Sequence, residues 1–424
     1  MAADGTGPES VVIVGAGQSG YQTAASLREH GYPGRITLIS DEDALPYERP
    51  PLSKAYLKGE ATEAELWLRP ATYFVRRSID LVRGTVTAID RASRTVRLAD
   101  GSGYPYGHLV LATGARPRTL AVPGAGLRGV HTLRTARDAA ALRASLDSAR
   151  RVVVVGAGFI GLECAAVARA SGREVTVLEA LDRPLARVAS GRTAAHVTRL
   201  HQRAGTRLLF GRGVAALHGD RRGRVVEVES ADGDRLPADL VLIGVGVSPC
   251  TELAAAAGLP VDDGITVDSR LLTGDPHVSA VGDCAAFPQV RSGNRQRIES
   301  VQNAVGHARS VAARLTGSPA RYGEVPWFWS DQFTTTVQIA GLGGGHDTEV
   351  VLGDDDPEGF SVLLFRGDAL LAVESVNRPV DHLAARQILQ RRVGLGPEDV
   401  GAEGFSLRGH LALRAGGSAA PVVR

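Results

Sequence analysis

The sequence predicts an α/β protein built on two copies of one strand–helix–strand unit. A short pattern occurs twice, as VVIVGAGQSG at residues 11–20 and as VVVVGAGFIG at residues 152–161. In each copy an apolar, β-branched run precedes the glycines and an alanine-rich stretch follows them. A second apolar run, RITLIS or EVTVLE, completes the unit. This order of strand, glycine turn, helix and strand is typical of βαβ units in a parallel sheet.

Each copy contains the spacing GxGxxG, which has a chemical reason. Glycines let the backbone approach a pyrophosphate at a helix N-terminus, where amide groups lack partners within the helix. One copy would leave a purely structural turn open as the alternative, whereas two copies in matching context predict two dinucleotide sites. The glycines are Gly15, Gly17 and Gly20 in the first copy and Gly156, Gly158 and Gly161 in the second.

The residue that ends the second strand of each unit indicates which nucleotide is bound. In the second copy it is Glu179, whose carboxylate can accept both hydroxyls of an adenosine ribose and would repel a 2′-phosphate. This favours NAD over NADP, although Arg183 nearby weakens the preference. In the first copy the position holds Ser40, and the acids Asp41 and Glu42 follow it. We expect Asp41 to bind the ribose, with an exposed loop acid of no function as the alternative.

Composition sets further bounds. The chain has 424 residues, and 44% hydrophobic and 22% charged residues are ordinary for a globular protein of two or three domains. A net charge of +2 argues against nucleic acid or a membrane surface as partner. No apolar run reaches the roughly 18 residues of a spanning helix, and the N-terminus lacks a signal core, so we expect no membrane segment and a cytoplasmic location.

The cysteines and the acidic run suggest no metal chemistry. Cys164, Cys250 and Cys284 are far apart and form no CxxC, so we expect buried thiols rather than a redox disulfide or a zinc site. The run GDDDPEG at residues 353–359 is expected to be a solvated hairpin loop, with a calcium site as the alternative.

The rest of the chain changes character several times. After the second copy it is predicted to be rich in strands up to Gly246, and a strand ends in SAVGDC. A helix is expected over residues 299–315. Beyond WFWSDQF we expect alternating short strands, a helix near residues 381–392, and a disordered Gly- and Ala-rich tail.

Several motifs together resemble one family. The two GxGxxG units, LPYERPPLSK, LATGARP, SAVGDC, PWFWSDQF and SVNRP are similar to those of the flavoprotein ferredoxin reductases of oxygenase systems, and the resemblance runs from about residue 10 to about residue 411. The ATG and GD motifs are shared by all disulfide-reductase-like flavoproteins that bind two dinucleotides. The more specific motifs are RPPLSK, WFWSDQ and VNRP.

The resemblance implies a domain plan. It predicts two Rossmann-like dinucleotide-binding domains and a C-terminal α+β domain. The FAD domain would comprise residues 10–115 and 247–322, the NAD domain residues 116–246, the C-terminal domain residues 323–412, and the tail residues 413–424. Cys250 stands where the family usually has Asn, and we expect no loss of chemistry from it.

The resemblance also implies the residues of the FAD site. The first three glycines would hold the pyrophosphate, Arg49 and Lys54 would line the flavin, and Asp283 would bind a ribityl hydroxyl. The residues that would support the flavin are Ala112, Thr113 and Gly114. A plain turn residue before a helix is the alternative for Asp283.

Lys54 stands out because Lys54 and Lys58 are the only lysines among 48 Lys and Arg residues. By resemblance Lys54 lies near N5 and the C4 oxygen of the flavin and pairs with Glu163. A compact ammonium there stabilises the charge of reduced flavin, where a planar guanidinium would crowd the ring. The alternative is a surface lysine retained by chance, which is our interpretation of Lys58.

The function implied is electron transfer from NADH through FAD to a [2Fe-2S] ferredoxin, which would serve a haem-thiolate monooxygenase or a Rieske-type dioxygenase. Such acceptors are usually acidic, so Arg309 and Arg378 are candidate docking residues, and Trp329 is a candidate for the electron-transfer face. For the arginines the alternative is a solvated side chain, and for Trp329 a half-buried strand residue.

Two other functions remain open. One is a peroxide-forming NADH oxidase, although its cysteine-dependent form needs a thiolate beside the flavin and no Cys occurs between residues 10 and 58. The other is an NADH-binding redox-sensing flavoprotein, for which the near-neutral charge argues only against a nucleic-acid partner.

Overall fold

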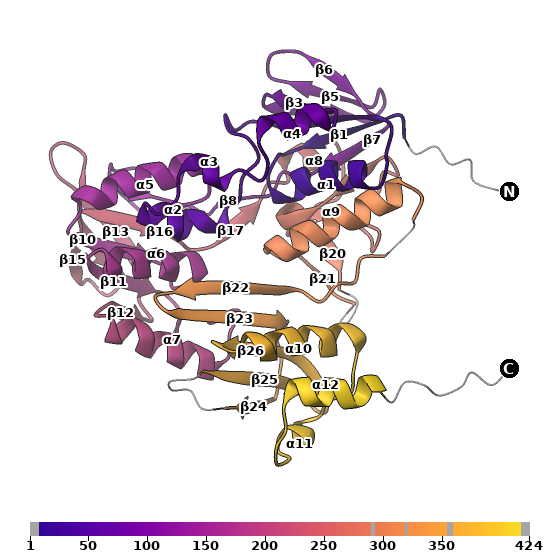
Figure 1. Ribbon diagram of the computed structural model, residues 1–424. Coiled ribbons are helices and arrows are strands. Elements are labelled where there is room, and N and C mark those ends of the chain that lie inside the picture. Colours follow the sequence, from indigo (N-terminus) through magenta and orange to yellow (C-terminus); the bar gives the residue numbers. More distant parts are fainter. Residues whose placement is uncertain (1–7, 290–292, 319–320, 354–358, 417–424) are drawn as a thin grey trace. The chain divides into compact units, whose positions relative to one another are not determined.

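The computed structural model describes residues 8–289, 293–318, 321–353 and 359–416 (Figure 1). The chain divides into two compact units. The first unit comprises residues 1–49, 62–116 and 247–324, and the second comprises residues 50–61, 117–246 and 325–424.

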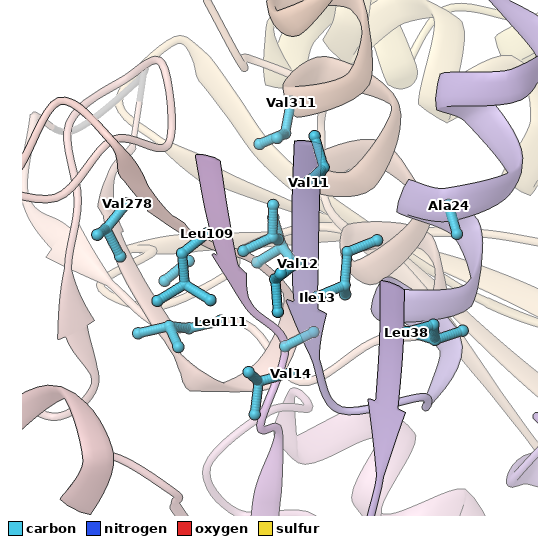
Figure 2. Close-up of a cluster of buried hydrophobic side chains, with 14 of the residues drawn as sticks. Val11, Val12, Ile13, Val14, Ala24, Leu38, Leu109, Leu111, Val278 and Val311 are labelled. Atoms are coloured by element: carbon cyan, nitrogen blue, oxygen red, sulfur yellow. The ribbon is translucent and has the colours of Figure 1, made fainter. Parts of the chain in front are cut away.

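A five-stranded parallel sheet in the order β19-β7-β1-β2-β3 forms the centre of the first unit. Its strands are β1 (Ser10–Val14), β2 (Arg35–Ser40), β3 (Ile79–Arg83), β7 (His108–Leu111) and β19 (Val278–Ala280). The buried residues of β1 are all apolar. Both faces of a parallel sheet are covered by other elements, so successive side chains of a central strand are buried whichever face they point to. Figure 2 shows this core, with Ala24 and Val311 packed on side chains of β1 and its neighbours.

Two helices cover this sheet and pack on each other, namely α1 (Gln18–Glu29) and α9 (Val301–Leu315). Helix α9 confirms the helix expected over residues 299–315. It begins after Ser300, whose hydroxyl accepts a hydrogen bond from the Asn303 N–H.

The remaining elements of the first unit are short. The helices are α3 (Glu63–Leu66), α4 (Ala71–Arg76), α8 (Glu252–Ala256) and the 3-10 turn η2 (Gly282–Cys284). One antiparallel sheet contains β4 (Val86–Asp90), β5 (Thr95–Leu98) and β6 (Gly103–Pro105). A mixed sheet contains β18 (Ile265–Thr266), β20 (Ala285–Pro288) and β21 (Arg295–Gln296), in which β18 is parallel to β20 and β21 is antiparallel to it. Strand β8 (Ala115–Pro117) pairs with β17 (Val247–Pro249).

The second unit contains the second copy of the repeat. Its parallel sheet has the order β12-β11-β10-β16-β9, with β9 (Val130–His131), β10 (Arg151–Val155), β11 (Glu174–Glu179), β12 (Arg207–Phe210) and β16 (Leu240–Ile243). Its helices are η1 (Pro50–Ser53), α2 (Ala55–Lys58), α5 (Ala136–Ser148), α6 (Phe159–Ala170) and α7 (Gly191–Arg203). A three-stranded sheet contains β13 (Val214–Gly219), β14 (Val225–Ser230) and β15 (Arg235–Pro237).

The region up to Gly246 is rich in strands, as predicted, but it also contains helix α7, which was not predicted. Its buried positions, Thr193, Ala194, Val197 and His201, recur at helical spacing. Two of these four residues are polar, so the apolar pattern alone did not reveal the helix.

The C-terminal part of the second unit is an antiparallel sheet in the order β22-β23-β26-β25-β24, followed by helices. The strands are β22 (Trp327–Gln332), β23 (Thr335–Gly341), β24 (Thr348–Leu352), β25 (Phe360–Arg366) and β26 (Ala369–Val376). The helices are α10 (Pro379–Arg391), α11 (Pro397–Val400) and α12 (Leu407–Gly416). The alternating strands and the helix near residues 381–392 are confirmed.

Two expectations concern the ends and loops of this part. The predicted disordered tail began at residue 413, but helix α12 continues to Gly416, so that boundary was wrong. The rest of the tail and residues 354–358 of the acidic loop lie outside the described residues.

The division into units differs in part from the predicted domains. The first unit resembles the predicted FAD domain, except that residues 50–61 belong to the second unit. The predicted NAD and C-terminal domains share the second unit, so the three-domain plan stays a prediction. In the ranges that the structure describes, no helix is both long and apolar enough to cross a membrane.

Candidate functional site

The first glycine loop has the geometry of a pyrophosphate site. Gly15 has φ 104°, and a Cβ there would lie 2.2 Å from the Ala112 carbonyl oxygen. A Cβ on Gly20 would lie 1.8 Å from the Gly15 carbonyl oxygen. At Gly17, directly before helix α1, the nearest atom is a guanidinium nitrogen of Arg49 at 4.0 Å. The outer glycines therefore permit the tight turn and the helix packing, while the middle one leaves an open approach to the helix N-terminus.

The second glycine loop repeats this geometry. Gly156 has φ 101°, and a Cβ there would lie 2.4 Å from the Gly244 carbonyl oxygen. A Cβ on Gly161 would lie 2.2 Å from the Gly156 carbonyl oxygen, whereas at Gly158 the nearest atom is 4.0 Å away. Both loops thus fit the phosphates of a dinucleotide.

Glu179 is fixed beside the second loop by backbone groups. Its Oε2 accepts the Ala157 N–H at 2.7 Å, and its Oε1 accepts the Leu181 N–H at 2.9 Å. Each carboxylate oxygen has a further lone pair, so Glu179 can still accept ribose hydroxyls. Arg183, which weakened the expected preference for NAD, donates to Asp182 at 3.3 Å.

In the first unit the acids after β2 have different surroundings. Asp41, our candidate ribose partner, is exposed, and Ser40 accepts the Glu42 N–H at 3.2 Å. The Glu42 carboxylate accepts hydrogen bonds from Tyr47 and from Arg49, each at 2.5 Å. Because Arg49 is the residue nearest to Gly17, Glu42 is the acid connected to the glycine loop. Sequence reasoning passed over it, since the Glu42, Tyr47 and Arg49 contacts follow no helix or strand period.

Arg49 lies in a strongly polar setting. Burial disfavours its charged form, but Tyr47 and Glu42 outweigh this effect, and together with Asp283 they raise the pKa of Arg49. Arg49 and Asp283, both expected at the FAD site, are therefore brought together in the first unit.

The ATG and GD motifs follow neighbouring strands. Ala112, Thr113 and Gly114 come directly after β7, where Thr113 donates to the Cys250 carbonyl at 2.6 Å and the Cys250 N–H donates to the Gly114 carbonyl at 2.9 Å. Asp283 follows β19 in the turn η2. Since β1, β7 and β19 are parallel neighbours, these motifs meet at the carboxyl edge of one sheet, where such folds bind ligands.

The turn that carries Asp283 is held by two buried side chains. The Gly282 N–H donates to Nδ1 of His307 at 3.2 Å, and burial lowers the pKa of His307 to about 3. Arg297, whose side chain is 6% exposed, donates to the Asp283 carbonyl at 3.4 Å and to Glu299 at 2.5 Å.

Lys54 and Glu163 form an ion pair within the second unit. The Lys54 Nζ lies 2.8 Å from Glu163 Oε2, and the side chains are 20% and 2% exposed. Lys54 directly precedes α2, and Glu163 lies on α6. Ser53 donates to the same Oε2 at 2.5 Å, and Ser330 donates to Oε1 at 2.7 Å. The expected pair is present, and its role stays a prediction. Lys58 by contrast faces Glu60 at 3.8 Å with both side chains exposed.

The candidate docking residues fall into both units. Arg309 is exposed on α9 of the first unit. In the second unit, Arg378 donates to Asp381 at 3.0 Å just before α10. Trp329 on β22 is half-buried, with its ring 5.8 Å from that of Trp327. Within the second unit the structure thus exposes parts of both Trp329 and Arg378.

Among the described residues there is no group of three or more His, Cys, Asp or Glu side chains that could hold a metal ion. Cys164 and Cys284 are buried, and burial raises the pKa of each thiol. Cys250 is only partly buried, contrary to expectation, because its backbone lies along the Thr113–Gly114 turn at the sheet edge.

Comparison with known proteins finds two family models. The model described as pyridine nucleotide-disulphide oxidoreductase matches residues 9–308, and the model described as reductase C-terminal matches residues 327–411.

Curated relatives match over most of the chain. A rhodocoxin reductase of Rhodococcus erythropolis is 50% identical over 400 residues, which are 94% of this chain and 93% of that protein. A putidaredoxin reductase of Pseudomonas putida is 42% identical over 405 residues, 94% of this chain and 96% of that protein.

Solved structures give the same result. The ferredoxin reductase for the CYP199A2 system from Rhodopseudomonas palustris has a TM-score of 0.93 at 48% identity, covering 95% of this chain and 99% of that one. The covalent putidaredoxin reductase–putidaredoxin complex has a TM-score of 0.93 at 41% identity, covering 96% and 99%. A water-forming NADH oxidase from Lactobacillus brevis has a TM-score of 0.85 at 19% identity, covering 96% and 99%, a likeness of fold alone.

Proposed function

Because the chain belongs to the pyridine nucleotide-disulphide oxidoreductases and, within them, to the ferredoxin reductases of oxygenase systems, we propose that it passes electrons from NADH through FAD to a [2Fe-2S] ferredoxin. It is an oxidoreductase, and FAD and NADH are the cofactors. Bound FAD supplies a centre that takes two electrons as hydride and releases them singly.

The first unit would hold FAD. Gly15, Gly17 and Gly20 place open backbone at the N-terminus of α1, where the pyrophosphate would bind. Arg49 adds a partly buried positive charge to this region, and Asp283 offers a carboxylate just after β19. Glu42 is linked to Arg49 and is a second candidate, beside Asp41, for the adenosine ribose.

The second unit would bind NADH. Gly156, Gly158 and Gly161 form the pyrophosphate site, and Glu179 is already fixed beside it by two backbone N–H groups. A fixed carboxylate accepts ribose hydroxyls without losing freedom on binding, so it favours NADH and orients it.

The observation that carries the proposal is the Lys54–Glu163 pair. In a chain with two lysines, one is held 2.8 Å from a carboxylate that is 2% exposed. A hydrogen-bonded counter-charge restricts the position of the ammonium. Lys54 would therefore present one fixed positive charge to the flavin and stabilise negative charge there.

Trp329 and Arg378 of the second unit and Arg309 of the first unit are accessible, and each is a separate candidate for contact with the acceptor. Positive side chains suit an acidic ferredoxin and speed its encounter. One solved relative is a covalent complex of a putidaredoxin reductase with putidaredoxin, and this supports a ferredoxin as the partner here. Such a ferredoxin would serve a haem-thiolate monooxygenase or a Rieske-type dioxygenase.

The test is NADH-dependent reduction of cytochrome c by the purified yellow protein, with and without a panel of [2Fe-2S] ferredoxins. Peroxide formation and an NADPH reaction are measured alongside. We expect strong stimulation by one or more ferredoxins, little peroxide, and a weaker reaction with NADPH. Reduction by NADH without acceleration by any ferredoxin would favour the oxidase or the sensor function instead.

A further inference from the structure

Glu163 stands at the end of a buried chain of hydrogen bonds that extends away from Lys54. The Ser330 hydroxyl lies 2.7 Å from Glu163 Oε1, and Gln332 Nε2 lies 3.1 Å from the Ser330 hydroxyl. Nε2 of His201 lies 2.9 Å from Oε1 of the same Gln332. Ser330 and Gln332 lie on β22 and His201 on α7, and each of the three is 0% exposed.

This chain has one consistent direction. A serine hydroxyl has a single hydrogen, and Ser330 uses it on the Glu163 carboxylate, which is acceptor-only when ionised. The amide N–H of Gln332 must then donate to Ser330, which leaves its carbonyl oxygen to accept from His201. Every donor therefore points toward Glu163.

His201 fits this direction as a neutral ring protonated on Nε2. Burial lowers the pKa of His201, although its bond to Gln332 acts the other way. Its Nδ1 is buried and has no hydrogen-bond partner among the described residues. With the proton on Nε2, the buried Nδ1 is an acceptor without a hydrogen-bond partner. With the proton on Nδ1, a buried N–H donor would lack a partner, and Nε2 would have to accept from Gln332, which reverses the direction of the hydrogen bonds.

These polar residues are unusual because they lie among apolar side chains. The same part of the second unit is an apolar cluster that includes Leu57, Leu162 and Phe328, and Phe328 packs edge-on against Phe159 of α6 at 4.9 Å. If positions 330, 332 and 201 served only to fill space, apolar side chains would do so at lower cost. A buried polar network costs free energy unless every polar group in it has a hydrogen-bond partner. The hydrogen-bonded residues Ser330, Gln332 and His201 thus have a role other than filling space.

We propose that Ser330, Gln332 and His201 are positioning residues for the Lys54 ammonium. They orient the Glu163 carboxylate through Oε1, while Ser53 and Lys54 occupy Oε2. Loss of the donor on Oε1 frees the carboxylate to turn and leaves Lys54 without a fixed partner. This inference rests on the proposed function, since it concerns the charge that Lys54 presents to bound FAD.

The main test compares three variants by the midpoint potential of bound FAD, measured by spectroelectrochemical titration. Ser330→Ala removes the donor, and Ser330→Thr keeps a hydroxyl. Ser361→Ala is the matched control, because Ser361 lies in the same sheet, is 0% exposed, and bonds Ser375 and Asp381 at 3.1 Å outside this chain.

We expect Ser330→Ala to lower the potential by about 30 mV, which is a tenfold change in the equilibrium constant of a two-electron couple. Ser330→Thr should restore most of the shift, and Ser361→Ala should leave the potential unchanged even though it loses thermal stability. Equal potentials in Ser330→Ala and Ser361→Ala would overturn the inference.

A second test reads the wild-type holoprotein itself and uses a variant only to assign one signal. In ¹⁵N NMR spectra of the wild-type holoprotein, we expect His201 to show a proton on Nε2, with the signal assigned by its loss in His201→Phe. A proton on Nδ1 would reverse the chain and contradict the proposal. If the wild-type protein fails to bind FAD or to react with NADH, the proposed function fails and the inference falls with it. If the wild-type protein binds FAD and reacts with NADH, but Ser330→Ala leaves the midpoint potential of FAD unchanged, the inference fails while the proposed function stands.

Discussion

Removing the charge of Glu163 should destabilise the second unit far more than removing that of an exposed acid. Glu163 is 2% exposed and faces Lys54 at 2.8 Å, so Glu163→Gln leaves an ammonium without its counter-charge. The substitution keeps the volume and a hydrogen-bonding carbonyl, which limits the change to charge.

The structure sets the magnitude. Removing one partner of a buried pair costs about 3–5 kcal/mol, because the other charge is left uncompensated. The Lys54 side chain is 20% exposed and can regain some water, so we expect about 3 kcal/mol, the low end of that range. The exposed pair Lys58–Glu60, 3.8 Å apart, provides the matched control at about 0–1 kcal/mol.

The assay is a double-mutant cycle on the free energy of unfolding in urea. It uses Glu163→Gln, Lys54→Met and the double variant, in parallel with Glu60→Gln, Lys58→Met and their double. We expect the buried pair to show a coupling energy of about 1–3 kcal/mol, since residues in one network are not additive, and the exposed pair to show almost none. Equal coupling in the two pairs would refute the view that Glu163 holds Lys54 through charge.

Three further predictions concern the loops, the nucleotide and pH. Gly17→Ala should fold normally, since its nearest neighbour is 4.0 Å away, yet lower FAD affinity about tenfold or more by filling the approach to the helix N-terminus. Gly20→Ala, with a Cβ 1.8 Å from a carbonyl oxygen, should instead lose about 1–3 kcal/mol of stability; flavin content and thermal unfolding separate the two effects. Glu179→Gln should improve the affinity for NADPH relative to NADH about tenfold, as measured by titration of both nucleotides, because it removes repulsion of the 2′-phosphate; an unchanged ratio would exclude Glu179 as the selector. The pKa of His307 falls from 6.5 to about 3 on burial, so its contribution to stability is complete above pH 6.5 and is lost as pH falls toward 3. Between pH 6.5 and pH 3, His307 should contribute about 1.4 kcal/mol per pH unit to the change of the unfolding free energy with pH. If His307→Asn shows the same pH dependence of unfolding free energy as the wild type, this prediction is wrong.

The parts of the fold whose apolar residues or glycines recur at a short, regular spacing were predictable from sequence. Strands β1 and β10, the glycine loops after them and helix α9 have apolar or glycine patterns that local geometry dictates. The scarcity of lysine singled out Lys54, but its pairing with Glu163 was expected from family resemblance alone, since no local rule joins residues so far apart in the chain.

The rest of the site depends on contacts that leave no local signal. Ser330 meets Glu163 across 167 positions, and Ser53 meets it across 110. Helix α7 was missed because polar Thr193 and His201 occupy half of its buried positions, and His201 is needed there as a hydrogen-bond donor. Where a helix face carries a polar network, the apolar pattern that predicts helices is weakened by the same residues that serve the site.

The central claim is that electrons from NADH leave this protein singly to a [2Fe-2S] ferredoxin. The most direct measurement mixes the FAD-loaded protein with NADH, in excess of the flavin but limiting relative to oxidised ferredoxin, under anaerobic conditions and follows the visible absorbance of the iron–sulfur cluster. The account predicts that two ferredoxins are reduced per NADH, at a rate that rises with ferredoxin concentration. Full reduction of the flavin while the cluster stays oxidised would contradict it.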